Sequence, residues 1–203
     1  GSDQIRVLTN RESDTVINGT FDWVYEEELG LRDGYRWSPD GKAIAYWQLD
    51  EEGVPEMNML NNVSGYYPKL ITFRYPKTGE TNAIGRVGVV QLEDGQTTWM
   101  KVPGDPRNHY IARMDWADNS SQLLLQQLNR LQNQNKVMLA EVRSGKVKTA
   151  YTDEDQAWIE VRFGFTQWIE KGKQFTYVSE REGWRQLYFV SREGRKVRKV
   201  TEG

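Results

Sequence analysis

Cysteine is absent from this chain of 203 residues, and histidine occurs once, as His109. Without cysteine the chain forms no disulfide and offers no thiolate for catalysis or metal binding. A structural zinc site usually takes four cysteine or histidine ligands, which one histidine does not supply. A lone histidine beside a tyrosine at the expected start of a strand more often packs or forms a hydrogen bond than it catalyses. We therefore expect no metal site and no cofactor.

Long apolar runs are also missing. A membrane-spanning helix needs roughly 18 or more consecutive apolar residues and a secretory signal needs an apolar core, and neither occurs here. The opening Gly-Ser pair, residues 1–2, is typical of a cleaved expression tag, so we expect the natural chain to begin earlier. The missing targeting segment and the missing cysteine therefore leave the compartment unknown.

Neither sign of charge is in large excess, because 27 basic residues stand against 29 acidic ones. A nucleic-acid-binding surface usually shows as a basic cluster, and the one basic run, at residues 192–199, is more typical of a solvated hairpin. We therefore expect no nucleic-acid partner. Hydrophobic residues make up 37% of the chain and aromatic residues 12%, which is enough to bury a core.

The common catalytic and phosphate-binding motifs are missing as well. The sequence contains no Gly-x-Ser-x-Gly nucleophile elbow and no glycine-rich phosphate loop. Paired carboxylates serve a glycosidase only when they face each other across the substrate, and adjacent glutamates on a turn rarely do so. We expect no catalytic residue in this chain taken alone.

The most regular feature that is present is a module of tryptophan, polar turn and strand. It occurs at residues 35–50, 112–129 and 163–180, and second hairpins follow at 135–152 and 184–201. Alternating apolar residues between turn signals predict short antiparallel strands. We therefore predict an all-β fold with little helix.

The spacing of these modules indicates a partial β-propeller. Trp116 and Trp168 lie about 52 residues apart, close to the roughly 40–50 residues of a four-stranded blade. Residues 1–203 then form one propeller segment of about three to four blades, and a β-sandwich is the alternative fold. Because a closed propeller needs about four to eight blades, we predict an open arc. Its exposed blade faces should lead to dimerisation, swapping or marginal stability.

The stretch FDWVYEEELG, residues 21–30, places three glutamates behind aromatic residues. Asp22 is a good N-cap and Gly30 a good C-terminal cap residue, so we predict a short helix of about two turns. Two adjacent carboxylates in front of such a helix repel each other unless a cation lies between them. A ligand ammonium would satisfy them, and the alternative is a solvated surface turn.

Six stretches of the sequence carry a resemblance to a known family; they are DWVYEEE (22–28), WSPDGKAIAY (37–46), RYPKTGETN (74–82), HYIARMDW (109–116), LLLQQLNRLQN (123–133) and SEREGWRQLYF (179–189). In this order they resemble the N-terminal β-propeller of dipeptidyl peptidase IV, within the prolyl oligopeptidase family of serine peptidases. The resemblance covers nearly the whole chain.

The resemblance implies an eight-bladed propeller that caps an α/β-hydrolase domain carrying a Ser-Asp-His triad. Such enzymes release N-terminal dipeptides with a penultimate proline or alanine. It implies that Glu27 and Glu28 bind the α-ammonium of the substrate's N-terminus, with Glu26 on the helix surface. The family's partner arginine lies upstream of this chain, and the hydrolase domain is expected downstream.

The resemblance also suggests three further features. Arg162 and Phe163 are weaker candidates for contacts in the substrate cleft, because the local spacing there departs from the family pattern. The insertion at residues 54–76 resembles an arm that projects from a blade and helps to form a homodimer. For a bacterial source, the family suggests a periplasmic or cell-envelope location.

Two other hypotheses remain. The chain could belong to a non-catalytic propeller that serves as a protein-interaction scaffold, with the acidic helix as ordinary surface. It could also belong to a relative that kept the architecture and lost its triad. A nucleophile elbow encoded downstream distinguishes the peptidase from both.

Overall fold

The computed structural model describes residues 4–10, 12–162, 164 and 166–202. Within these residues strands dominate, and the one helix is α1 (Trp23–Glu27). The strands form antiparallel sheets. The prediction of an all-β fold with one short helix is therefore confirmed. None of the helical structure in the described residues is long and apolar enough to cross a membrane.

The first sheet is built from five strands in which β3 is central; they are β1 (Val16–Asn18), β2 (Tyr35–Trp37), β3 (Ala43–Asp50), β6 (Ile84–Gln91) and β7 (Thr97–Trp99). β3 pairs with β6 on one side and with both β1 and β2 on the other. The polar turn predicted in the first module is present between β2 and β3 as Ser-Pro-Asp-Gly. In it the Ser38 hydroxyl accepts hydrogen bonds from the backbone N–H groups of Lys42 and Ala43.

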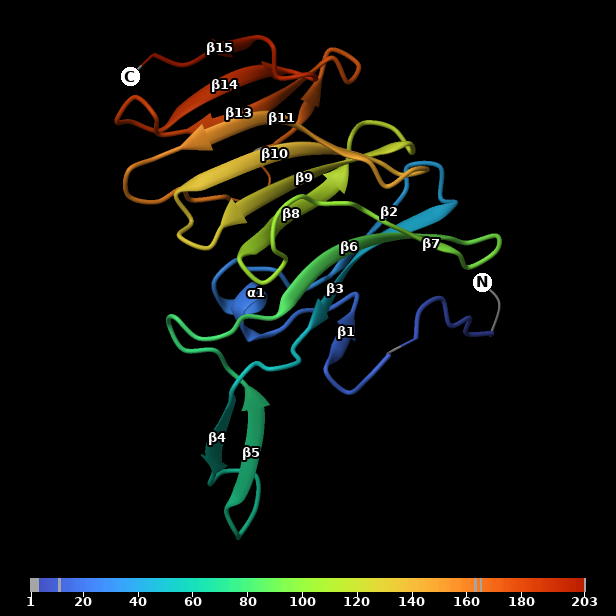
Figure 1. The fold of residues 1–203 in the computed structure, drawn as a ribbon, viewed down its shortest axis with the longest axis vertical. Helices are drawn as coiled ribbons and strands as arrows, with labels where there is room; N and C mark the ends of the chain where they lie inside the picture. Colours follow the sequence, from blue (N-terminus) through green and yellow to red (C-terminus); the bar gives the residue numbers. More distant parts are fainter. Residues whose placement is uncertain (1–3, 11, 163, 165, 203) are drawn as a thin grey trace.

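The other two blade-like sheets are four-stranded meanders. The second contains β8 (His109–Trp116), β9 (Gln122–Asn129), β10 (Gln134–Glu141) and β11 (Val147–Glu154). The third contains β12 (Trp168–Ile169), β13 (Gln174–Ser179), β14 (Gln186–Ser191) and β15 (Val197–Lys199). In each of them strands adjacent in sequence are neighbours in the sheet. Figure 1 shows the three sheets following one another along the molecule.

The core lies between the sheets, so the second sheet is buried on both faces. Its strand β9 carries three leucines in a row, and successive side chains point to opposite faces. Leu123 and Leu125 belong to the cluster shared with the first sheet, which includes Trp47. Leu124 belongs to the cluster shared with the third sheet. The Trp47 indole N–H also donates to the Ile111 carbonyl at 2.9 Å, which joins the first two sheets.

A separate two-stranded hairpin, β4 (Glu56–Asn61) and β5 (Lys69–Arg74), is inserted between β3 and β6. It projects away from the stacked sheets (Figure 1). Both of its strands are largely exposed, including apolar side chains at their centres. This hairpin lies within the insertion at residues 54–76.

Candidate functional site

The acidic helix α1 interrupts the edge strand of the first sheet. β1 pairs with Gln48–Asp50 of β3 and β2 pairs with Ile44–Tyr46, so the two short strands line up along the same edge. Gly19 donates to the Trp47 carbonyl at 2.9 Å, and Trp47 donates to the Gly34 carbonyl at 3.0 Å. Residues 20–33 therefore form an excursion that leaves the edge after β1 and returns before β2.

Glycines close the neck of this excursion. Gly34 donates to the Gly19 carbonyl at 3.1 Å. A Cβ atom on Gly34 would lie 2.6 Å from the Gly19 carbonyl carbon, a distance that side chains do not tolerate. The two ends of the excursion can approach this closely only because no side chain stands between them.

The N-cap predicted for the helix is present, but α1 is shorter than the two turns expected, with five residues and Glu28 as its C-cap. The Asp22 carboxylate accepts from the Tyr25 backbone N–H at 2.9 Å, the usual N-cap contact. At the other end the Glu28 backbone N–H donates to the Val24 carbonyl at 2.9 Å, and beyond it Gly30 has a φ of +66° and Leu31 donates to the Tyr25 carbonyl at 3.1 Å. Burial raises the pKa of Asp22, although backbone hydrogen bonds oppose this effect.

Tyr25 anchors the buried side of the helix to the second sheet. Its hydroxyl accepts from the Ile111 backbone N–H on β8 at 3.0 Å. Its ring stacks on Phe21 and meets Tyr110 edge to face. Burial raises the pKa of Tyr25 above its usual range, so the hydroxyl stays protonated. Because this side is fixed, the following glutamates are held at the surface.

Glu26, Glu27 and Glu28 are all exposed. The carboxylates of Glu27 and Glu28 form no hydrogen bond or ion pair with any other described residue. Glu28 lines an open pocket of about 440 Å³, whose other walls include Tyr75 and Tyr110. Convergence of the two carboxylates on one cation stays a prediction.

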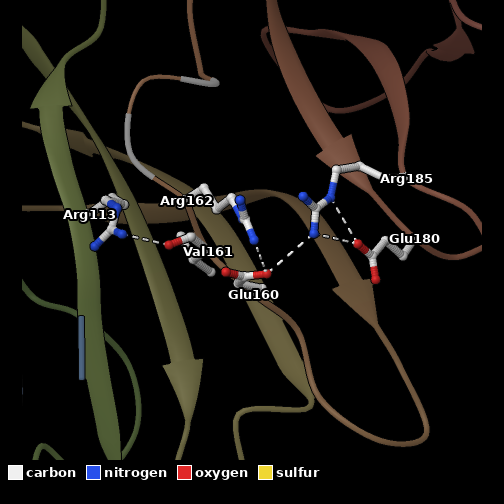
Figure 2. A network of polar contacts seen from close by, with 6 residues as sticks. All are labelled: Arg113, Glu160, Val161, Arg162, Glu180 and Arg185. Carbon is white, nitrogen blue, oxygen red and sulfur yellow. Dashed lines mark hydrogen bonds and ion pairs between the residues drawn. The ribbon is translucent and has the colours of Figure 1, made fainter. Parts of the chain in front are cut away.

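The second candidate segment precedes β12. Arg162 donates to the Glu160 carboxylate at 2.8 Å, and the same carboxylate pairs with Arg185 at 3.3 Å. Arg185 also pairs with Glu180 at 2.8 Å, so these four side chains form the exposed network in Figure 2. The hydrogen bond from Arg162 is the main cause that holds the pKa of Glu160 below its usual range. Phe163, the other candidate here, lies outside the described residues.

Arg113 lies on β8 between the two candidate segments, and it was not among the residues predicted for the site. It donates to the Leu29 carbonyl next to Glu28 and to the Val161 carbonyl next to Arg162. The available signal was an arginine within the otherwise buried run HYIA-R-M, because a charged side chain in a buried strand requires polar partners.

His109 lies in a packed environment on β8. It is buried, and Gln127 donates from its side-chain amide to the imidazole Nδ1 (2.9 Å) and to the Pro103 carbonyl (2.8 Å). Burial lowers the pKa of His109. Among the described residues no group of three or more histidine and acidic side chains is placed to hold a metal ion.

Comparisons with known proteins agree on one family. The family model described as "Dipeptidyl peptidase IV (DPP IV) N-terminal region" matches residues 1–203. A protein of Emericella nidulans named "Probable dipeptidyl peptidase 4" is 28% identical over 216 residues, which cover 98% of this chain and 28% of that protein. The "Inactive dipeptidyl peptidase 10" of Rattus norvegicus is 31% identical over 162 residues, which cover 78% of this chain and 20% of that protein.

A solved structure shows the same architecture. The crystal structure of Porphyromonas gingivalis dipeptidyl peptidase 4 superposes with a TM-score of 0.87 at 32% identity, covering 96% of this chain and 28% of that one. The chain thus spans less than a third of the length of the proteins it matches.

Proposed function

The chain belongs to the dipeptidyl peptidase IV N-terminal region family, and from this premise we propose that it carries the amine-binding site of a serine exopeptidase. The parent enzyme would release N-terminal dipeptides with a penultimate proline or alanine. Its Ser-Asp-His triad would lie in a hydrolase domain of the same protein, against which this propeller segment packs. The family resemblance and the propeller fold predicted from the sequence are both confirmed.

The observation that carries this proposal is the presentation of Glu27 and Glu28. Both are exposed on a helix whose caps and buried tyrosine fix its position, and no described cation neutralises them. A peptide's α-ammonium has three donors, and each charge-assisted hydrogen bond contributes roughly 1.5–3 kcal/mol. Holding the amine at a fixed point places the second peptide bond at one distance from it, so binding is converted into alignment. A longer N-terminal extension would collide with the helix.

The test uses the complete protein that joins this chain to a hydrolase domain. We expect Glu27→Gln and Glu28→Gln each to lower kcat/KM for a Gly-Pro amide by roughly 10- to 100-fold, the loss of one charge-assisted contact. Glu26→Gln is the matched control and should change it little. Melting temperatures should stay close to the wild-type value, because all three side chains are exposed.

An N-acetylated substrate measures how much the free α-ammonium contributes to cleavage. The wild-type enzyme should strongly prefer the free Gly-Pro amide over its N-acetylated form, and the two glutamine variants should lose much of this preference. Unchanged cleavage and unchanged preference in both variants would contradict the proposed clamp.

We also propose that the arm at residues 54–76 contributes to a homodimer. Within the part of the chain that the structure describes, its strands β4 and β5 pair with each other only. The apolar residues Leu60 and Leu70 lie directly opposite each other, with 60% and 66% of their surfaces exposed. Tyr66 and Tyr67 at the tip are exposed as well. Exposed apolar and aromatic residues on a projecting ribbon suit burial against a second copy.

A scaffold without activity is the second candidate function, and one comparison favours keeping it. The similar protein of Rattus norvegicus is named inactive, so membership of the family does not by itself establish catalysis. The sequence encoded after residue 203 decides between the two, because only a peptidase requires a nucleophile elbow and its triad partners.

A further inference from the structure

One guanidinium joins the two candidate segments. Nη1 of Arg113 donates to the Leu29 carbonyl at 2.9 Å and to the Ala112 carbonyl at 2.6 Å. Nη2 donates to the Val161 carbonyl at 2.6 Å (Figure 2). Leu29 directly follows Glu28, and Val161 directly precedes Arg162. The side chain therefore bonds to the main chain of both segments, one residue away from each candidate group.

The contact at Leu29 completes the fixation of the acidic helix. A helix of five residues is not stable by itself and depends on tertiary contacts. Asp22 and Tyr25 hold its beginning and its middle. Carbonyl groups at the end of a helix lack intrahelical partners, and a cation there is favourable. Arg113 places its charge near this end of α1 by donating to the Leu29 carbonyl, directly after the C-cap Glu28.

The contact at Val161 has the same effect on the other segment. The backbone of this segment is also held where Ile159 donates to the Gln132 carbonyl at 2.7 Å. Beyond Val161, the ion pairs of Glu160 orient the Arg162 side chain. The Val161 carbonyl is thus the point at which this network meets β8.

Only an arginine can make these contacts together. Its planar fork presents several donors in fixed directions, whereas a lysine ammonium is a compact charge at the end of a flexible stem. Arg113 is partly buried, and burial together with the nearby Arg36 lowers its pKa to about 10. At neutral pH the side chain therefore remains charged and keeps all of its donors.

We propose that Arg113 is a positioning residue that fixes the amine-binding glutamates of α1 relative to Arg162. The two groups come from different sheets, since α1 departs from the first and Arg162 lies between the second and the third. Without Arg113, each segment would keep its own local contacts but lose the bond to a shared reference point. This inference rests on the proposed function, because the glutamates matter here as substrate contacts.

The activity test uses the complete enzyme and a matched control. We expect Arg113→Met to lower kcat/KM for a Gly-Pro amide by about 10-fold or more, because alignment of the substrate is lost. Arg192 is the control, since it also donates to two main-chain carbonyls, those of Gly172 and Ala117, but touches neither segment. Arg192→Met should lower the melting temperature yet leave kcat/KM within about 2-fold.

A double-mutant cycle separates positioning from general destabilisation. In a Glu27→Gln/Glu28→Gln/Arg162→Met background, Arg113→Met has none of the proposed substrate contacts left to align and should lower kcat/KM by less than about 2-fold. A full 10-fold loss in that background overturns the positioning role and leaves the proposed function standing. If Glu27→Gln and Glu28→Gln are both silent in the wild-type background, the proposed function fails and this inference fails with it.

A second readout does not depend on activity. In Arg113→Lys, a variant chosen to preserve folding, amide hydrogen exchange should speed up in residues 23–31 and 159–162 and stay unchanged in β9 and β10. Arg192→Lys should leave both segments unchanged. Equal exchange in wild type and Arg113→Lys overturns the inference.

Discussion

Asp22 shows how one residue carries two opposing effects. Its carboxylate caps α1, but it is buried, and burial raises its pKa above the ordinary value of 3.8. A carboxyl whose folded pKa exceeds its unfolded pKa binds more protons in the folded state. Its contribution to stability therefore declines as the pH rises through that window. At neutral pH the charged cap is less favourable than a neutral cap of the same shape would be.

We therefore expect Asp22→Asn to keep the cap and to be at least as stable as the wild type at neutral pH. Asparagine is an equally good N-cap, whereas Asp22→Ala should cost about 0.5–2 kcal/mol. The advantage of asparagine over aspartate should shrink as the pH falls toward 3.8, where the aspartate becomes protonated in both states. Chemical denaturation at several pH values measures this. A stability difference that grows as the pH falls would contradict the assignment.

At the scale of elements, the arm formed by β4 and β5 makes the sharpest prediction. Leu60 and Leu70 are directly opposed, so Leu60→Glu with Leu70→Lys replaces an apolar pair by an opposite-charge pair that still supports the hairpin. If the arm buries these residues in a homodimer, the double variant of the complete protein should shift toward monomer. Sedimentation at several concentrations measures the shift.

The control for the arm exchanges charges at its base. Glu56 and Arg74 already form an ion pair at 3.9 Å, so Glu56→Arg with Arg74→Glu keeps opposite charges without touching the apolar surface. This variant should associate like the wild type. A dimer that survives the leucine double variant unchanged would contradict the role of the arm.

Local sequence patterns predicted most strands. They did not predict that the edge of the first sheet consists of two short strands, β1 and β2, with α1 between them. The apolar-rich run 43–50 and the turn before it are specified by nearby residues, and β3 forms there. β1 and β2 have only three residues each and become continuous only through β3. The turn indicates the pairing of β2 with β3, but no local pattern indicates that β1 pairs with β3, because Val16 lies opposite the distant Asp50.

In the candidate site, too, contacts between residues close in sequence were predictable and contacts between distant residues were not. The N-cap of α1 was predictable, because this capping contact involves residues close in sequence. Arg113 was not, because its partners Leu29 and Val161 lie 84 and 48 residues away.

At the scale of the whole molecule, the second sheet is the reference for both of its neighbours. The Ile111 carbonyl accepts a hydrogen bond from the Trp47 indole of the first sheet, and the Ile111 N–H donates to the Tyr25 hydroxyl of the acidic helix. On the opposite face, Asn135 donates to the Tyr177 hydroxyl of the third sheet at 2.9 Å. The third sheet has no comparable cover on its own far face within the described residues.

The far face of the third sheet is apolar and only partly covered. Along β13 and β14 alternate side chains are buried against the second sheet, while Val178, Leu187 and Phe189 face away and are only partly covered. Trp184 beside them is 76% exposed. An apolar sheet face without a partner favours association. We expect the 203-residue chain alone to self-associate or to be marginally stable, and light scattering at several concentrations measures its mass.

Surface variants distinguish this association from the arm. Val178→Lys with Leu187→Glu should reduce self-association of the isolated chain, because β13 and β14 pair these two positions directly and the opposite charges preserve the strand pairing. The Leu60→Glu/Leu70→Lys variant should leave association through the sheet face in place. A stable monomer of the unmodified chain at high concentration would contradict the prediction, since the second sheet would then suffice to stabilise the third without any cover on its outer side.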